Sequence, residues 1–151
     1  MTIREGRTED LEALVGIWLR AVRATHTFLT EADIQELLPV VRETALPALE
    51  LWVLCYDDEL AGFMGLDGSN VEALFIDPAF ARRGGGRMLL DHARRLKGAL
   101  RVDVNEQNPE ALKFYLAEGF EVVGRSDIDS GGRPFPLLHL RERQAEATDK
   151  H

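Results

Sequence analysis

An arginine- and glycine-rich segment is the part of the sequence best suited to bind an anion. It reads Arg82-Arg83-Gly84-Gly85-Gly86-Arg87 and stands between a predicted strand and a predicted helix. Glycines let the backbone approach a ligand closely, and the first turn of a helix offers unpaired N–H groups at the positive end of its dipole. The arginines add charge-assisted hydrogen bonds. The segment predicts a phosphate site, although a flexible surface loop with solvated arginines is an equal alternative from these residues alone.

Several other chemistries are disfavoured by the residue patterns that the sequence lacks. Leu89 stands where a dinucleotide-binding fingerprint needs its third glycine, and there is no Gly-Lys-Ser/Thr triplet of a P-loop. No serine lies in a Gly-x-Ser-x-Gly pattern, and no His-Glu-x-x-His pattern occurs. Cys55 is the only cysteine, which excludes an internal disulfide and a multi-cysteine metal site. We therefore expect neither a serine hydrolase nor a bound metal.

Basic residues are concentrated around the glycine segment. The net charge of the chain is −8, yet residues 81–98 hold six basic residues against Asp91 alone, which leaves −13 for the remainder. This distribution predicts an anion at the segment and a cationic partner elsewhere, and it argues against nucleic acid. The longest apolar run, Leu51–Tyr56, is too short to span a membrane, and the lone cysteine fits a reducing compartment. We expect a cytoplasmic protein with no membrane partner.

Hydrophobic periodicity predicts one α/β (α+β) domain. The expected order is β-αα-βββ-α-β-α-β-β, with a mixed central sheet flanked by helices. The second helix should begin after Thr30 as its N-cap and stop before Pro39, because proline has no backbone N–H to continue a helix. A later helix should run from Gly86 to about Lys97, directly behind the glycine segment. The domain should cover residues 1–141 and leave 142–151 as a polar, disordered tail.

The glycine segment and the strand before it resemble the acyl-CoA signature of the GNAT N-acetyltransferase family. That signature reads Gln/Arg-x-x-Gly-x-Gly/Ala, and its backbone amides hold the pyrophosphate of coenzyme A. Here Gly84 and Gly86 match the glycines. Ala81 departs from the Gln/Arg position, which leaves Arg82 as the nearest side chain that could replace it.

A second block, Asn108 to Phe120, resembles the family's Asn-x-x-Ala-x-x-Phe-Tyr-x-x-x-Gly-Phe segment. Shorter stretches at 24–29, 104–108 and 124–126 look like the YjaB/YiaC type of bacterial acetyltransferase, and the expected element order is also the family's order. The resemblance covers about residues 2–140. It implies a single GNAT-type domain that uses acetyl-CoA as its co-substrate.

The resemblance also implies roles for particular residues in acetyl transfer to an amine. Tyr115 would protonate the departing coenzyme A thiolate, and a backbone N–H near the end of the strand before the glycine segment would polarise the thioester carbonyl. Cofactor contacts are expected at Phe75, Ile76, Asp77, Arg82, Arg83, Gly84, Gly85, Gly86, Arg87, Asn105, Asn108 and Tyr115. The residues alone leave plainer roles open: Tyr115 as a core aromatic, Asn105 in a turn and Asn108 as a helix N-cap.

Glu72 is the candidate general base, acting directly or through water, because it is polar within an otherwise apolar strand. Alternation along that strand places Glu72 on one face with Leu74 and Ile76. A glutamate that is simply solvated at the strand's start is the alternative. No residue type in the sequence decides between a side chain and water as the base.

The acceptor should be a cationic amine, either a protein lysine or a small molecule, given the acidic remainder of the chain. The resemblance favours protein lysine. We expect the acceptor to meet Thr25, His26 and Phe28, together with the loop at 133–135. The rival function is an acetyl-CoA-binding sensor or scaffold without turnover, and the chain is expected to be a monomer or a homodimer.

Overall fold

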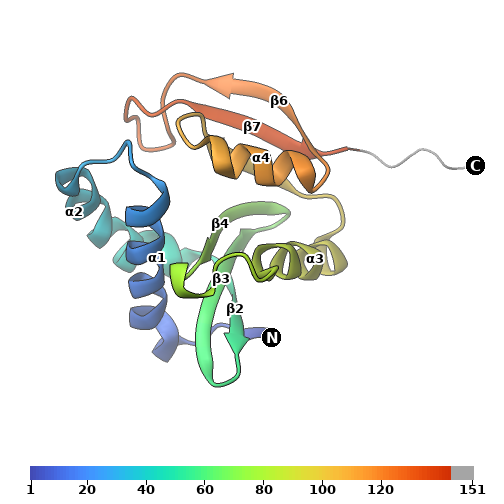
Figure 1. Cartoon of the computed structure of the whole chain (residues 1–151). Coiled ribbons are helices and arrows are strands. Elements are labelled where there is room, and N and C mark those ends of the chain that lie inside the picture. Colours follow the sequence, from blue (N-terminus) through green and yellow to red (C-terminus); the bar gives the residue numbers. More distant parts are fainter. Residues whose placement is uncertain (144–151) are drawn as a thin grey trace, which may run out of the picture.

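Seven strands form one mixed sheet in the order β1-β2-β3-β4-β5-β7-β6, in a computed structural model that describes residues 1–143 (Figure 1). The strands are β1 (Thr2–Glu5), β2 (Glu50–Tyr56), β3 (Glu59–Asp67), β4 (Asn70–Ile76), β5 (Arg101–Asn105), β6 (Phe120–Ser126) and β7 (Leu137–Glu142). The helices are α1 (Leu11–Thr25), α2 (Glu31–Val40), α3 (Gly85–Lys97) and α4 (Pro109–Ala117). The predicted fold class and order of elements are confirmed, with short helical turns added between them.

Strands β1 to β4 are paired with one another, and so are strands β5 to β7, but β4 and β5 are paired over only a short stretch. Every neighbouring pair is antiparallel except β4 and β5, which run parallel and share only two register pairs, Asn70 with Arg101 and Val71 with Val102. Beyond those pairs the two strands are not hydrogen-bonded to each other. The backbone groups on their facing edges are therefore free to meet a ligand.

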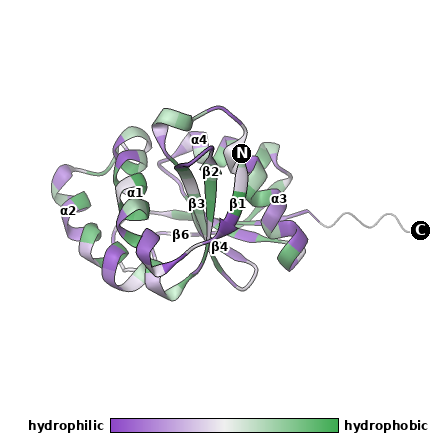
Figure 2. Ribbon diagram, turned by 90° about the horizontal axis from the view of Figure 1, so that it is seen from below, coloured by the Kyte–Doolittle hydropathy of each residue, from purple (hydrophilic) through white to green (hydrophobic). Residues whose placement is uncertain are grey.

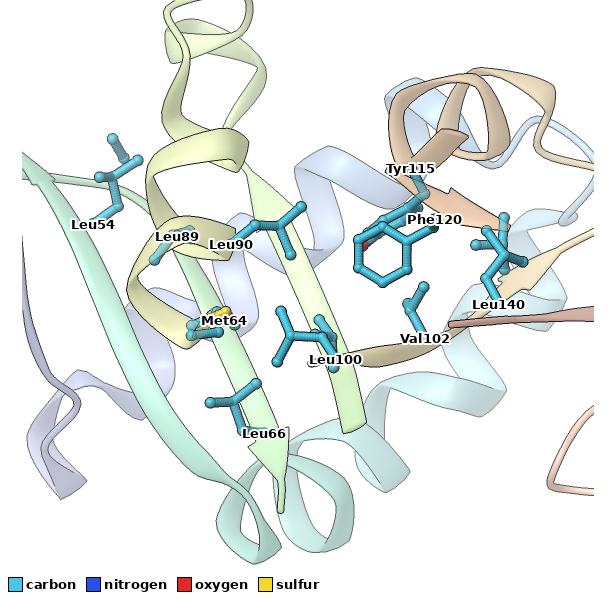
Figure 3. Close-up of a cluster of buried hydrophobic side chains, with 14 residues drawn as sticks. Leu54, Met64, Leu66, Leu89, Leu90, Leu100, Val102, Tyr115, Phe120 and Leu140 are labelled. Atoms are coloured by element: carbon cyan, nitrogen blue, oxygen red, sulfur yellow. The ribbon is translucent and has the colours of Figure 1, made fainter. Parts of the chain in front are cut away.

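Helices cover the two faces of the sheet and bury two separate cores. Leu14, Ile17 and Trp18 of α1 pack with Val53 and Phe63 of the sheet on one face. On the other face, Leu89 and Leu90 of α3 pack with Met64 and Leu100, beside Tyr115, Phe120 and Leu140 (Figure 3). Figure 2 shows hydrophobic and hydrophilic residues side by side along α1 and α3, as expected for helices with one buried face.

The prediction that the second helix stops before Pro39 is wrong. Thr30 does cap α2: its hydroxyl accepts the Asp33 N–H at 3.1 Å, and the Asp33 carboxylate accepts the Thr30 N–H at 2.9 Å. Pro39, however, lies inside α2, which ends at Val40 and continues into a wider π-helical turn over Val41–Ala45. A proline near a helix end removes one hydrogen bond without preventing the helical dihedral angles of its neighbours. The hydrogen bond that Pro39 cannot make lies just before the point where the α-helix gives way to the π-helical turn.

Strand β7 reaches past the expected domain end at residue 141. Glu142 is its last residue, and its carboxylate accepts hydrogen bonds from the Leu100 N–H at 2.9 Å and the Arg94 guanidinium at 2.6 Å. Arg143 donates its N–H to the Gly119 carbonyl at 3.0 Å. Residues 142 and 143 of the predicted tail thus take part in the fold, and the rest of that tail lies outside the described residues.

Candidate active site

A cavity of about 590 Å³ opens where β4 and β5 separate. Residues of both strands line it, along with the start of α3, the first turns of α4 and the end of α1. The segments that the sequence analysis singled out therefore meet in one place. The cavity connects the glycine segment at one end with Thr25 and His26 at the other.

The glycine segment forms the N-terminus of α3. Gly84 is the N-cap residue with φ 79°, a left-handed conformation that glycine adopts without strain, and the helix begins at Gly85, one residue before the predicted start. The Met88 N–H makes the first helical hydrogen bond, to the Gly84 carbonyl at 3.0 Å. The N–H groups of residues 85–87 precede that bond and have no helical acceptor. They lie at the edge of the cavity and have the arrangement that suits an anion.

Two of these glycines lie in closely packed surroundings. A Cβ on Gly85 would lie 2.6 Å from Cδ2 of Leu54, and a Cβ on Gly86 would lie 3.1 Å from Cζ of Phe114. Gly86 and Phe114 both line the cavity. A larger side chain at Gly86 would therefore occupy space beside the free amides.

The predicted arginine contacts divide into two groups. Arg82, which has a positive φ of 63°, and Arg87 line the cavity. Arg83 does not; its guanidinium carbon lies 5.0 Å from the ring centre of Tyr56 and 5.7 Å from that of Phe80. Arg83 thus turns away to stack on aromatic rings, and the structure favours Arg82 and Arg87 as the arginines that meet an anion.

The edge of β4 presents different amides from those expected. The Asp77 N–H donates to the Ala61 carbonyl of the neighbouring chain segment at 2.8 Å, and Phe75 is the register partner of Phe63. Because bonded pairs alternate along an antiparallel ladder, the N–H of Phe75 also points toward β3. The N–H groups of Leu74 and Ile76 point the other way, toward β5 and the cavity. As amide donors, Ile76 is retained from the predicted set and Leu74 is added to it. Phe75 still lines the cavity, although its N–H points away.

Asp77 serves the fold, which corrects its expected role as a cofactor contact. One carboxylate oxygen accepts two hydrogen bonds from Arg20, at 3.0 and 2.7 Å, and the other accepts the Ala79 N–H at 3.1 Å. Burial opposes ionisation of this carboxyl, but Arg20 and the Ala79 amide outweigh it and lower the pKa of Asp77. Asp77 therefore fixes the turn into the glycine segment and has neither its amide nor its carboxylate free for a ligand.

Tyr115 lines the cavity from α4 and is only 7% exposed. Its ring makes edge contacts with Phe114, at 5.1 Å between ring centres, and Phe120, at 5.3 Å. Burial raises the pKa of the Tyr115 hydroxyl above its ordinary value near 10. The hydroxyl is consequently protonated at neutral pH, the form that can donate a proton.

The two predicted asparagines differ in how they are used. Asn108 is the N-cap of α4, and its side-chain oxygen accepts the Ala111 N–H at 3.2 Å, as its alternative role required. Both asparagines line the cavity, and the side-chain oxygen of Asn105 is buried without a hydrogen-bond donor among the described residues. A buried acceptor of this kind is costly unless a ligand or water satisfies it. Asn105 fits a partner that brings an N–H group into the cavity.

Glu72 sits at an irregularity in β4. The register with β3 shifts between Val71 and Ala73, so Glu72 is the extra residue of a β-bulge. The shift places Val71 in the same core as Leu74 and Ile76, which corrects the expected alternation. Burial raises the pKa of the Glu72 carboxyl, and the carboxylates of Asp103 and Asp67 raise it further. Glu72 lines the cavity, as a base for an incoming amine must.

The far end of the cavity is lined by aromatic and hydroxyl groups. The Thr25 hydroxyl donates to the Ala21 carbonyl at 2.8 Å and lies 2.8 Å from Nδ1 of His26. The His26 ring is 5.4 Å from Phe28, which in turn is 5.8 Å from Phe135 in the β6–β7 loop. Burial lowers the pKa of His26, which favours the neutral ring. Thr25 and His26 line the cavity, while Phe28 packs behind them.

Sequence reasoning missed two charged residues that line this cavity, Asp103 and Glu110. Asp103 occupies an outward position of the alternating strand Arg101-Val102-Asp103-Val104-Asn105 and lines the cavity, as Glu72 does. The alternation of polar and apolar residues along this strand indicated that Asp103 faces outward. It did not show that Asp103 lies next to Glu72, because that depends on the pairing of β5 with β4.

Comparison with known proteins gives the class of the molecule. Residues 47–122 match the family model described as "Acetyltransferase (GNAT) domain". The chain belongs to the GNAT acetyltransferases and is an acetyl-CoA-dependent N-acetyltransferase, which confirms the predicted enzyme class and co-substrate. Across residues 1–143 no helix combines the length and apolar character needed to cross a membrane.

Particular relatives lie within this class. The chain is 48% identical to "Peptidyl-lysine N-acetyltransferase YjaB" of Salmonella typhimurium, over 93% of this chain and 97% of the relative. It is 31% identical to "Peptidyl-lysine N-acetyltransferase YiaC" of Escherichia coli, over 80% and 84% of the two chains. The solution structure of apo YjaB from Escherichia coli has a TM-score of 0.84 at 46% identity, covering 93% of this chain and 95% of that one. The predicted resemblance to this type is confirmed.

Proposed function

We propose that this protein transfers the acetyl group of acetyl-CoA to the ε-amine of a lysine in a protein or peptide. The observation that carries the proposal is the cavity between β4 and β5, which joins an anion site at a helix N-terminus to Tyr115 and Glu72. The relatives named as peptidyl-lysine N-acetyltransferases support lysine as the acceptor. The excess of acidic residues in the chain favours a cationic partner.

In this proposal the chain holds its co-substrate through backbone amides. The diphosphate lies against the free N–H groups of residues 85–87, with Arg82 and Arg87 adding charge. The pantetheine arm runs between the separated strands, where its amides meet the outward N–H groups of β4 and the unpaired oxygen of Asn105. One of the same β4 amides polarises the thioester carbonyl.

The reaction needs a neutral amine. A lysine amine with a pKa near 10.4 is mostly protonated at pH 7, and removing the proton costs roughly 4–5 kcal/mol. Glu72, acting directly or through a water, accepts that proton. The amine then attacks the thioester carbon, the tetrahedral intermediate collapses, and Tyr115 gives its proton to the departing thiolate. The nitrogen loses a second proton as it becomes the amide, and that proton returns to the Tyr115 oxygen. The amide product and coenzyme A leave, and the one proton released overall is the one held by Glu72.

The experiment that tests this function is mass spectrometry of lysine peptides and of free amines incubated with the protein and acetyl-CoA. Acetylation of peptide lysine supports the proposal. Saturable acetyl-CoA binding with no acetylated product from any amine would favour the sensor or scaffold instead. If only small amines are acetylated, acetyl transfer is correct but the acceptor is a small molecule rather than a peptide lysine.

Glu72→Gln should lower kcat/KM for a lysine peptide at pH 7 by at least about tenfold, because the variant has no carboxylate to accept the proton. In the wild type, kcat/KM should rise with pH as Glu72 loses its proton, and that rise should lie above the ordinary range of a glutamate because its pKa is raised. This rise of kcat/KM with pH should be absent from Glu72→Gln. Glu121→Gln, at an exposed ion pair with Arg141 on β6 and β7, is the control. If Glu72→Gln shows the same rise of kcat/KM with pH, a group other than Glu72 causes it.

Arg82→Ala should weaken acetyl-CoA binding about tenfold, because a charge-assisted contact with the diphosphate is lost. Arg83→Ala should change the dissociation constant no more than about twofold, since its guanidinium stacks on Tyr56 and Phe80 and does not line the cavity. Isothermal titration calorimetry on both variants measures the difference. The reverse order of effects would mean that Arg83 turns toward the ligand.

A further inference from the structure

A row of hydrogen-bonded polar side chains crosses the C-terminal half of the sheet. His139 of β7 is flanked in register by Asp103 of β5 and Gly124 of β6. Its Nδ1 lies 2.7 Å from Oδ1 of Asp103, and its Nε2 lies 2.6 Å from the hydroxyl of Ser126. The ring is therefore held at both nitrogens. The family signatures account for neither His139 nor Asp103.

The Asp103 end of this row lies next to Glu72 in the sheet. Val71 and Val102 are the last register partners of the parallel strands β4 and β5, and Glu72 and Asp103 are the residues that follow them. Adjacent strands lie about 4.8 Å apart, so Glu72 and Asp103 are neighbours at the point where the sheet opens, and both line the cavity there. The influence of Asp103 on the pKa of Glu72 is consistent with this proximity.

A second cavity, of about 310 Å³, lies over the row. Glu72 and Asp103 line both cavities, whereas His139 lines only the second. The two cavities therefore share the carboxylates as a common wall. A proton taken from a substrate in the first cavity has a path through this wall to the second.

We propose that Asp103 and His139 carry the acceptor's proton from Glu72 to solvent in the second cavity. This inference rests on the proposed function. The ammonium of the acceptor gives a proton to the Glu72 carboxylate, Glu72 passes it to Asp103, and His139 takes it from Asp103. The resulting imidazolium donates one N–H to Asp103 and the other to the Ser126 oxygen, then loses one proton to water. One proton enters the row and one leaves it in each turnover.

Ser126, His139 and Asp103 are also hydrogen-bonded in the order of a catalytic triad, with a serine as nucleophile, a histidine as base and an acid. Ser126, however, lines neither cavity, so a bound substrate does not meet its hydroxyl. Asp103 and His139 do line the second cavity. The geometry therefore favours proton transfer, with Asp103 and His139 as the proton carriers and Ser126 as the positioning residue that holds the ring.

Other charged groups surround the row. They are Glu72 on β4, Asp67 on β3, Arg101 on β5, Arg141 on β7 and Glu121 on β6. Arg141 and Glu121 pair with each other at 3.4 Å.

His139→Gln tests the relay, because glutamine keeps hydrogen bonds but does not carry a proton near neutral pH. We expect kcat for a lysine peptide at pH 7 to fall about tenfold, with KM for acetyl-CoA within about twofold of the wild type. Added imidazole should restore a large part of the lost rate. Glu12→Gln, at an ion pair with Arg42 outside both cavities, should match the wild type throughout. Asp103→Asn breaks the same route at an exposed position and gives a second, independent variant should His139→Gln fold poorly.

The outcomes separate the relay from the proposed function. If the wild type acetylates no lysine peptide, the proposed function fails and the relay fails with it. If the wild type is active and both variants equal it, the relay alone is wrong. A loss that imidazole does not restore would also overturn it, since that result indicates a purely structural role. Loss of ester hydrolysis of p-nitrophenyl acetate in Ser126→Ala would instead assign Ser126 as a nucleophile and replace the relay.

Discussion

Tyr115→Phe is expected to lower the turnover of acetyl transfer by more than about tenfold, because the thiolate leaves without a proton donor. The affinity for acetyl-CoA should change little, since the variant retains the ring and its contacts with Phe114 and Phe120. The raised pKa of Tyr115 keeps the hydroxyl protonated in the wild type, so its contribution should persist across neutral pH. Steady-state kinetics and calorimetry on the same preparation measure both quantities.

Tyr56→Phe is the matched control. Tyr56 is the other tyrosine of the chain, and its ring lies under the Arg83 guanidinium outside the cavity. The control should retain wild-type turnover. Equal turnover in Tyr115→Phe would remove the proton-donor role and leave Tyr115 as the core aromatic that its burial also allows.

Gly86→Glu should abolish measurable binding of acetyl-CoA. The new side chain would begin 3.1 Å from the Phe114 ring and would bring a negative charge to the N–H groups that await a diphosphate. Calorimetry with acetyl-CoA should show no saturable heat. The helix itself should persist, because an acidic residue in the first turn is favourable for the helix dipole.

Two further variants separate charge from bulk at this position. Gly86→Ala adds only the crowded Cβ and should weaken binding less than Gly86→Glu does. Leu96→Glu places the same charge on an exposed position near the other end of α3 and should bind normally. An unchanged dissociation constant for Gly86→Glu would move the diphosphate away from the helix N-terminus.

The free amides at the start of α3 could be predicted from the sequence because the features that specify them are local. Glycines before a helix, with arginines beside them, specify free amides wherever the helix lies. The order of strands and helices was also accessible, since hydrophobic periodicity is a local property. Asn108 as an N-cap followed from its position before Pro109.

The features that sequence reasoning missed depend on contacts between distant elements. The bulge at Glu72 appears only when β4 is paired with β3, and it changes which side chains share a face. The internal use of Asp77 requires Arg20 from α1, and the turning of Arg83 requires the rings of Tyr56 and Phe80. The row from Asp103 to Ser126 requires three strands in register. None of these partners is adjacent in sequence.

The central claim is that coenzyme A lies between β4 and β5 with its diphosphate on the N-terminus of α3. Backbone amide NMR during titration with coenzyme A tests it most directly. We expect saturable shifts concentrated at residues 74–76, 84–87 and 105, and none of comparable size in Gly86→Glu. Shifts confined to other parts of the sheet, or no saturable shifts at all, would contradict it.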